Sequence, residues 1–436
     1  KSLASTSASL RVFASSACAA ESVSNRRVAS ESGGLLLSYP RLRCYCAGQC
    51  DMPNDEIEGY RYALEYALGI PFSGGNRLTA LQNGREIFPA MLAAIQSAEH
   101  RIDFATYVYW TGDIAENFAQ ALAAAATRGV RVRVLLDSFG ARPIEKQHLQ
   151  TLSASNVDVR WFRPLKTFRV RRVDKRTHRK ILVCDEKVAF TGGVGIADEW
   201  TGDARHPDEW RDMHLRLEGP AVAALRAAFA DNWNEAGEWD WDRPLARPEK
   251  HSGGVPVQVV RSASTIGWTA MAAVLRSLVA VARSRLRIVT AYFVPDPAML
   301  RQIKNAVARG VSVEILIPGR FTDSRLSQLA GHHATEQLLA LGVSVFRYQK
   351  TMLHTKLILV DDLVCCIGSP NMNHRSMGKD EECCVVALAP ELAATLAAEF
   401  ENDCTDAEKL EYSAWSKRGG LLKLREQLAR MLIEQL

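Results

Sequence analysis

Apolar and polar positions repeat one succession of periods twice along the chain. In the first round, a helix, a strand, a second helix and a second strand are predicted at residues 85–98, 101–110, 113–128 and 130–137. In the second round, the same four elements are predicted at residues 271–282, 287–294, 297–309 and 311–318. We therefore expect an internal duplication of an α/β unit, with a period too long for a solenoid.

A short polar motif, His-x-Lys-x₄-Asp, follows each round. Its members are His178, Lys180 and Asp185 in the first copy, and His354, Lys356 and Asp361 in the second. Each motif contains an unbroken apolar run, at 181–183 and 357–360, of the kind that suits a strand covered on both faces. One copy could be an ordinary strand end with an incidental His and Lys, but two copies in matching contexts argue against chance.

The spacing of the motif indicates phosphate chemistry. Residues two apart on a strand share a face, so the His and the Lys of each copy are expected to point the same way. An imidazole that titrates near neutrality, beside an ammonium group, can hold a phosphate and attack or protonate it. If the two rounds face each other about a pseudo-two-fold axis, one His can be the nucleophile while the other protonates the leaving oxygen.

The doubled motif resembles the signature of the phospholipase D superfamily. The second copy continues with Gly-Ser-x-Asn at 368–371, Arg-Ser at 375–376 and Asp-x-Glu at 380–382. After the first copy, Gly-Gly at 192–193, Trp-Arg-Asp at 210–212 and Leu-Arg-Leu-Glu-Gly-Pro at 215–220 resemble bacterial cardiolipin synthases, especially the short type without transmembrane helices. The resemblance covers residues 77–436 and departs at Gly195, which stands where the second copy has Asn371.

The resemblance implies an α/β fold of two pseudo-symmetric phospholipase D-like halves, each a mixed β-sheet flanked by helices, with the active site at their interface. It implies that His178 forms a phosphohistidine and that His354 protonates the departing alcohol, although symmetry leaves the reverse assignment open. Asp212 and Glu382, at matching places after the two motifs, are interpreted as the acceptors that hold the histidine tautomers, each serving its own or the opposite half.

The other polar residues of the motifs are expected to support this chemistry. Ser369 and Asn371, together with the two lysines, would stabilise the phosphoryl oxygens as charge builds. Asp185 and Asp361 are counted with the catalytic motif, but anchoring the turn after each strand is the more plausible role. No metal or other cofactor is expected, because the carboxylate and histidine set of a two-metal site is not evident.

The attacking alcohol decides the reaction. If it is a hydroxyl of phosphatidylglycerol, the enzyme is a cardiolipin synthase-type phosphatidyltransferase that releases glycerol, which is our leading hypothesis. If it is water, the enzyme is a phosphodiesterase that hydrolyses phospholipid or nucleic acid; a binding protein with an inactive site is a third hypothesis, against which the intact motifs argue. The aromatic residues near the predicted strand ends suit an acyl-chain rim, base stacking or plain core; they are Tyr107, Tyr109, Trp110, Tyr292 and Phe293.

The chain is divided on its patterning into a leader, two halves with a linker, and a tail. The boundaries are 1–56 for a disordered leader, 57–242 and 257–411 for the halves, 243–256 for the linker and 412–436 for an amphipathic C-terminal helix. Leu421, Leu424, Leu428, Leu432 and Leu436 fall on one face of that helix. This face could dock on the body, or the helix could lie in a headgroup layer with its basic residues towards the lipid phosphates.

Composition and charge indicate where the protein acts and what it binds. The 436 residues have 47% hydrophobic and 24% charged content and a net charge of +5, which describes an ordinary globular protein. Residues 163–180 are strongly basic, which favours contact with anionic headgroups, although a solvated loop is the alternative. No window is apolar enough to span a bilayer. We therefore expect peripheral association with the cytoplasmic side of a bacterial inner membrane, phosphatidylglycerol and cardiolipin as partners, and no nucleic acid.

Cysteine usage is consistent with a reducing compartment. Five cysteines lie in apolar, strand-like runs, which favours buried free thiols: Cys184, Cys365, Cys366, Cys383 and Cys384. Cys44, Cys46 and Cys50 form C-x-C-x₃-C without an obvious fourth zinc ligand.

Overall fold

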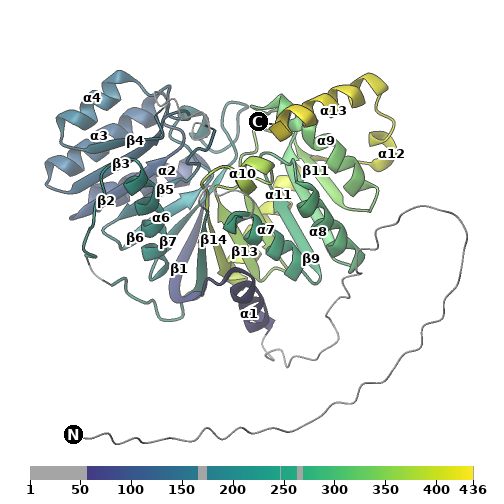
Figure 1. Cartoon of the computed structure of the whole chain (residues 1–436), viewed down its shortest axis with the longest axis horizontal. Helices are drawn as coiled ribbons and strands as arrows, with labels where there is room; N and C mark the ends of the chain where they lie inside the picture. The colour runs from purple at the N-terminus through teal and green to yellow at the C-terminus, as the bar shows by residue number, and fades with distance from the viewer. Residues whose placement is uncertain (1–55, 165–173, 246, 263–268, 436) are drawn as a thin grey trace, which may run out of the picture. The chain divides into compact units, whose positions relative to one another are not determined.

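The computed structural model describes residues 56–164, 174–245, 247–262 and 269–435 (Figure 1). These residues all belong to the unit Met52–Leu436. The predicted leader, except for residue 56, and the C-x-C-x₃-C cysteines lie outside the described residues, as do residues 165–173 of the basic stretch.

Among the described residues, fifteen strands join into one sheet. The first half contributes β1 (Ser73–Gln82), β2 (Arg101–Thr106), β3 (Arg131–Asp137), β4 (Asp158–Phe162), β5 (Ile181–Cys184), β6 (Val188–Gly192) and β7 (Met213–Glu218). The second half contributes β8 (Val255–Arg261), β9 (Arg285–Val289), β10 (Ser312–Pro318), β11 (Ser344–Tyr348), β12 (Leu357–Val360), β13 (Val364–Gly368), β14 (Cys383–Leu388) and the edge strand β15 (Ala407–Lys409).

The strand order shows the duplication directly. Antiparallel pairing of β1 with β8 joins the halves. Outward from this seam, the order is β1-β7-β6-β5-β2-β3-β4 on one side and β8-β14-β13-β12-β9-β10-β11 on the other. Strands with the same place in each round therefore occupy the same place in each half, and the predicted fold class of two pseudo-symmetric halves is confirmed.

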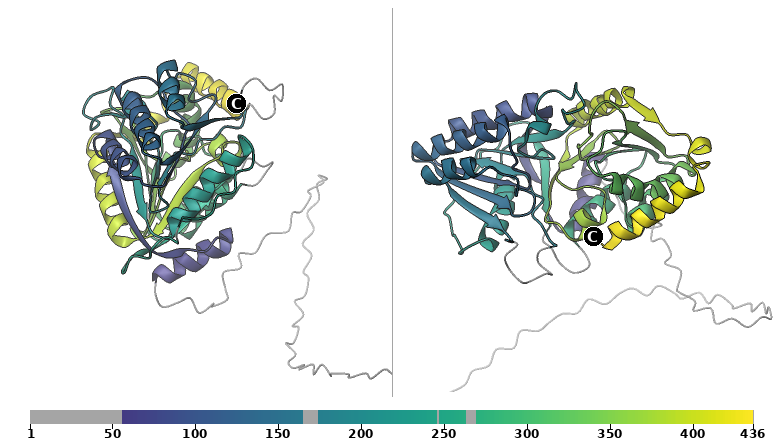
Figure 2. Two further views of the ribbon diagram at one scale, coloured as in Figure 1. Left: turned by 90° about the vertical axis from the view of Figure 1, so that its left-hand side faces the viewer. Right: turned by 90° about the horizontal axis from the view of Figure 1, so that it is seen from above.

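Helices flank the strands of each half (Figure 2). The first half carries α2 (Asn83–Ser97), α3 (Asp113–Thr127), α4 (Lys146–Ala154), the short 3₁₀ helix η1 (Asp198–Trp200) and α6 (Ala221–Glu235). The second carries α7 (Ala270–Val281), α8 (Pro297–Ala308), α9 (Arg325–Leu339), α10 (His374–Gly378), α11 (Pro390–Thr405), α12 (Tyr412–Trp415) and α13 (Gly420–Gln435). The first helix, α1 (Glu56–Leu68), packs on α7, so it belongs with the second half by contact.

The apolar core explains why the halves stay together. One cluster of buried side chains lies under α2 and α3, and another under α7 and α8. A third cluster combines α6 and α11 with strands of both halves, including Leu215 of β7 and Leu357 of β12. Successive residues of β5 and β12 alternate between an outer cluster and this shared cluster, which is why their apolar runs are unbroken.

Candidate active site

The segments that carry the two histidines cross to the opposite half before they enter their own strands. The backbone N–H of His178 donates to the carbonyl of Glu381 at 2.9 Å, just before β14. In the same way, the backbone N–H of His354 donates to the carbonyl of Arg211 at 2.7 Å, just before β7. This exchange of backbone contacts brings both motifs to the seam between the halves.

His178 is held by a carboxylate of the second half. Its Nδ1 lies 3.1 and 3.0 Å from the two carboxylate oxygens of Glu382, which is fully buried. The hydroxyl of Ser369 also donates to Glu382 and accepts from the backbone N–H of Cys383 at 3.1 Å. Burial would raise the pKa of Glu382, but His178, Lys180 and Ser369 outweigh burial and hold it below its usual range.

His354 is held by a carboxylate of the first half. Its Nδ1 lies 2.7 Å from Oδ2 of Asp212, which also accepts from the indole N–H of Trp200 at 2.9 Å. The other carboxylate oxygen accepts from the backbone N–H of Met213 at 2.8 Å. Burial would raise the pKa of Asp212, but His354 and Lys356 outweigh it and lower the pKa. Each orienting carboxylate thus serves the opposite half, one of the two arrangements the sequence allowed.

These pairs fix the tautomer of each ring. A carboxylate that accepts from Nδ1–H leaves Nε2 without a proton and available to a substrate. Nζ of Lys356 also lies 2.9 Å from Nδ1 of His354. A lysine ammonium can only donate, so a hydrogen bond from Lys356 would require Nδ1 to carry no proton, whereas the bond to Asp212 requires Nδ1 to carry one. We assign the Nδ1 proton to the Asp212 bond, while Lys356 donates to the carbonyl of His354.

Both motif lysines are buried, and burial lowers their pKa. The ammonium of Lys180 donates to the carbonyl of His178 at 2.9 Å. Burial, with the charge of Lys356, lowers the pKa of Lys180 to about 7 against the opposing effect of Glu382. Burial also lowers the pKa of Lys356 to about 8. Burial first, and then Lys356, lowers the pKa of His354 to about 4. A bound phosphate anion would favour the charged form of all three groups.

The two histidines open into a common pocket of about 210 Å³. Both halves contribute to its lining, which comprises Tyr107, Val108, Trp110, His178, Lys180, Trp200, Trp210, Tyr292, Asp323, His354, Asn371, Asn373, Arg375, Ser376 and Asp380. Of the aromatic residues singled out from the sequence, Tyr107, Trp110 and Tyr292 line the pocket. Tyr109 is instead core, with its hydroxyl bonded to the carbonyl of Ala115 at 2.8 Å, and Phe293 is buried in the second half's core.

The motif aspartates lie outside this lining. Asp185 follows β5 and accepts backbone N–H bonds from Glu99, His100 and Arg101 at 2.8–2.9 Å. Asp361 follows β12 and accepts the matching three, from Arg283, Ser284 and Arg285. The carboxylates of both aspartates are therefore engaged in anchoring the hairpin turns. Ser369 is likewise engaged with Glu382 and does not line the pocket, whereas Asn371 does.

Comparison with known proteins identifies the family. The family model for the phospholipase D-like domain of cardiolipin synthase matches residues 91–231 and 275–404. Cardiolipin synthase 1 of Bacillus anthracis is 31% identical over 405 residues, which cover 86% of this chain and 79% of that protein. Cardiolipin synthase of Geobacillus kaustophilus is 30% identical over 376 residues, covering 85% and 74%. The chain belongs to the phospholipase D-like cardiolipin synthase family. The resemblance and the enzyme class predicted from the two motifs are confirmed.

Solved structures support the fold. The crystal structure of phosphatidylserine synthase from Haemophilus influenzae Rd KW20 aligns with a TM-score of 0.67 at 15% identity, covering 86% of this chain and 98% of that one. Polyphosphate kinase from Porphyromonas gingivalis aligns with a TM-score of 0.53 at 12% identity, covering 88% of this chain and 55% of that one. At these identities the likeness concerns the fold alone.

The two halves of this family member differ where Gly195 replaces the counterpart of Asn371. A Cβ at Gly195 would lie 2.6 Å from Cβ of Val108 and 3.3 Å from the ring of Trp200. Gly193 occupies the place of Ser369, and a Cβ there would lie 2.2 Å from the carboxylate of Asp212. The indole of Trp200 therefore takes the donor role that Ser369 has in the second half.

Sequence reasoning did not single out four residues of the pocket lining, which are Val108, Trp200, Asp323 and Asn373. Trp200 donates to Asp212, and no spacing relative to the motifs marks it. Asp323 lines the pocket and accepts a hydrogen bond from the hydroxyl of Tyr292, but it lies in the loop after β10, far from either motif in sequence. By contrast, Arg375 and Asp380 were within the quoted continuation of the second motif and lie at the pocket.

Within the described ranges, no group of three or more His, Cys, Asp or Glu is placed to hold a metal ion. Of the helices that the structure describes, none combines the length and apolar character needed to cross a membrane.

Proposed function

We propose that this enzyme transfers a phosphatidyl group from one phosphatidylglycerol to a hydroxyl of a second, forming cardiolipin and releasing glycerol. The observation that carries the proposal is the crosswise pairing of His178 with Glu382 and of His354 with Asp212 at one pocket. Relatives named cardiolipin synthase, about 30% identical over most of the chain, supply the reaction type.

In the first step, Nε2 of His178 attacks phosphorus, a P–N bond forms and the P–O bond to glycerol breaks. His354 gives its proton to the departing glycerol oxygen. The lowered pKa of His354 means that this proton must be held in the substrate complex, where the phosphodiester anion opposes the effects of burial and of Lys356. The reverse assignment exchanges the two histidines and leaves the same overall reaction.

In the second step, His354 accepts the proton of a hydroxyl of the second phosphatidylglycerol as that oxygen attacks phosphorus. The P–N bond breaks, His178 is regenerated and His354 is again protonated, so atoms and protons balance over the cycle. The ammonium groups of Lys180 and Lys356 are placed to neutralise the phosphoryl oxygens in both steps. The buried amide oxygen of Asn371 has no hydrogen-bond partner within the described chain and, as an acceptor, is available to a hydroxyl of a substrate.

We further propose that the enzyme works on the cytoplasmic side of a bacterial inner membrane as a peripheral protein, with anionic phospholipid and not nucleic acid as its partner. The bacterial sources of its relatives support this placement. The free state of Cys184, Cys365, Cys366, Cys383 and Cys384, all buried, is compatible with a reducing compartment.

Product analysis tests the proposal. Purified enzyme and phosphatidylglycerol in detergent micelles should yield cardiolipin and glycerol in equal amounts, measured by mass spectrometry, with the same yield when a chelator is added. His178→Ala and His354→Ala, checked for folding by circular dichroism, should yield neither product. Phosphatidic acid as the main product would establish the hydrolase instead, and cleavage of labelled DNA without lipid turnover would establish a nuclease.

A further inference from the structure

The C-terminal helix α13 turns its apolar face away from the protein. Five large apolar side chains are more than half exposed: Leu421 at 67%, Leu424 at 53%, Leu428 at 52%, Met431 at 55% and Leu432 at 54%. Their spacing of three, four, three and one residues places them along one stripe of the helix. We call these five residues the apolar row.

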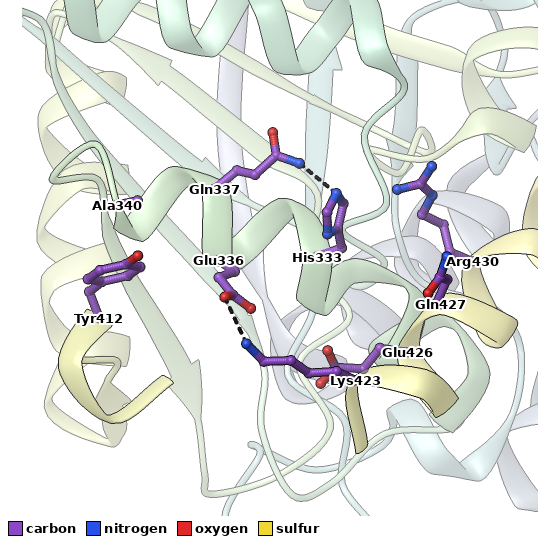
Figure 3. A pocket seen from close by; sticks show the side chains of 9 residues that line it. All are labelled: His333, Glu336, Gln337, Ala340, Tyr412, Lys423, Glu426, Gln427 and Arg430. Carbon is purple, nitrogen blue, oxygen red and sulfur yellow. Dashed lines mark hydrogen bonds and ion pairs between the residues drawn. The ribbon is translucent and has the colours of Figure 1, made fainter. Parts of the chain in front are cut away.

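The opposite face of α13 attaches the helix to the body, and it does so mainly through polar contacts. Glu426 is buried, lies 2.9 Å from Nδ1 of His332 in α9 and accepts from Arg418 at 3.0 Å. Lys423 bonds Glu336 of α9 at 3.2 Å, as Figure 3 shows beside the pocket between these helices. A surface helix ordinarily buries its apolar stripe and exposes its polar one. In α13 this arrangement is inverted, because the polar face attaches the helix to the body and the apolar row stays exposed.

The C-terminal part of α13 lies near the active-site pocket. Ala429 of α13 is buried in a small cluster with Ala330 and Val294. Val294 forms a β-bridge with Asn373, which lines the pocket. The views agree, since the C-terminal end of α13 lies beside α10 in Figures 1 and 2. The C-terminal end of the apolar row therefore lies near the pocket.

Charge favours a lipid surface as the occupant. Arg425 is exposed on α13 at one edge of the apolar row, whereas Arg430 lies on the other face of the helix, where it lines the pocket between α13 and α9. A helix with an apolar stripe and a basic edge lies at the headgroup boundary of an anionic bilayer, with the stripe buried and the cation near the phosphates.

We propose that the apolar row of α13 inserts into the surface of an anionic phospholipid bilayer and holds the pocket mouth against it. This inference rests on the proposed function, because it takes the pocket's substrate to be a phospholipid within that bilayer. Insertion places the acyl-chain region and the reacting phosphodiester on the same side of the enzyme. The lipid substrate then needs to rise only partly from the bilayer to reach His178 and His354.

Vesicle binding by the full chain tests this inference. The variant Leu424→Ser/Leu428→Ser/Met431→Ser should bind phosphatidylglycerol vesicles at least ~10-fold more weakly than wild type in a flotation assay, because three apolar side chains no longer leave water. The matched control, Tyr62→Ser/Tyr66→Ser, alters side chains of α1 that are 59% and 83% exposed. This control should bind as wild type does.

Activity separates this inference from the proposed function. On substrate in detergent micelles the triple variant should match wild type, whereas on vesicles its rate should fall with its binding. If no enzyme form makes cardiolipin in either assay, the proposed function fails while the flotation result still decides the role of the row. Vesicle binding equal to wild type in the triple variant would overturn the inference. A loss of oligomer in light scattering with unchanged vesicle binding would also overturn it and show that a second copy covers the row.

Discussion

At the scale of single residues, the two carboxylate–imidazole pairs are supported by different donors. Glu382 receives the hydroxyl of Ser369, whereas Asp212 receives the indole N–H of Trp200. In the first half, Gly193 and Gly195 have no Cβ to clash with Asp212 and with Val108 and Trp200. We infer that Trp200 is a positioning residue, acting on His354 through the carboxylate of Asp212.

Replacing Trp200 with phenylalanine tests this role. The ring remains, but the buried Asp212 loses one of its donors, a hydrogen bond to a charged group worth about 1.5 kcal/mol. We expect kcat to fall about tenfold with little change in KM, because the substrate contacts of the pocket persist. Steady-state kinetics on micellar phosphatidylglycerol measure both. Trp239→Phe, at a site 74% exposed, is the control, and an unchanged kcat in Trp200→Phe would remove the positioning role.

The buried lysines have a cost for folding that depends on pH. Lys180 has a pKa of about 7 in the folded protein against about 10.4 in an unfolded chain, so between these values the unfolded state binds more protons. The destabilisation is therefore complete below pH 7 and shrinks as the pH rises towards 10.4. We infer that Lys180 is retained for phosphate binding in spite of its effect on stability.

Lys180→Met should accordingly be inactive and more stable. We expect the free energy of unfolding to rise by on the order of 1 kcal/mol at pH 6.5, with a smaller difference from wild type at pH 9. Urea unfolding at the two pH values gives this difference, and Lys187→Met, an exposed lysine of the same hairpin, is the control. A variant less stable than wild type at both pH values would contradict the account.

At the scale of elements, periodicity located the helices and two of the four strands well but overran the C-terminal ends of the other two strands. The helix predicted at 297–309 is α8 (Pro297–Ala308), but the strand predicted at 287–294 ends at Val289. The hydroxyl of Thr290 bonds the carbonyl of Tyr292 at 3.3 Å and accepts from the backbone N–H of Met372 at 3.1 Å. The chain therefore leaves the strand here and delivers Tyr292 to the pocket, which alternation of apolar residues could not indicate.

The first half shows the same departure from its predicted strand. The strand predicted at 101–110 ends at Thr106, whose hydroxyl bonds the carbonyl of Val108 at 2.8 Å. Tyr107 and Trp110 follow and line the pocket. In both halves, a threonine that bonds the backbone two residues onward ends the strand where the site begins. The sequence predicted the aromatic residues near the site but not the break that places them.

The hairpin after each motif strand was better indicated. Asp185 and Glu186 have positive φ angles of 52° and 56°, and the N–H of Lys187 bonds the carbonyl of Cys184 at 3.0 Å. This is a type I′ turn, which favours Asp because Asp tolerates the left-handed region. Asp361 and Asp362 repeat it in the second half. The motif aspartates thus occupy the turn position that the sequence analysis favoured for them.

Element patterning also left the orientation of the tail undecided. The leucine spacing predicts one amphipathic helix at 412–436, and the structure has two helices there, α12 and α13. Period alone cannot say which face meets the body. That choice depends on partners such as His332 and Glu336 of α9, which pair with the polar face. These contacts between residues far apart in the sequence turn the leucine face outward, and no local sequence pattern could indicate them.

At the scale of the whole molecule, the site exists only while both halves are joined. Each histidine depends on a carboxylate of the other half, and the shared core under α6 and α11 runs between them. Arg211, which precedes Asp212, adds a further link between the halves, because its guanidinium donates a hydrogen bond of 2.9 Å to the buried carboxylate of Asp403 in α11. The duplication in the sequence predicted a site shared by the two halves. Which half supplies the carboxylate for each histidine became clear only from the three-dimensional structure.

The central claim is that the two histidines act on one phosphodiester, with a bond to nitrogen as the intermediate. Wild-type enzyme turning over ³²P-labelled phosphatidylglycerol, quenched in denaturant at high pH because a P–N bond is acid-labile, should carry label on the peptide that contains His178. His178→Ala should carry none, and His354→Ala should release any label it acquires more slowly than wild type. A wild-type enzyme that makes cardiolipin with no label on the protein would contradict the account, and label on the His354 peptide would reverse the two roles.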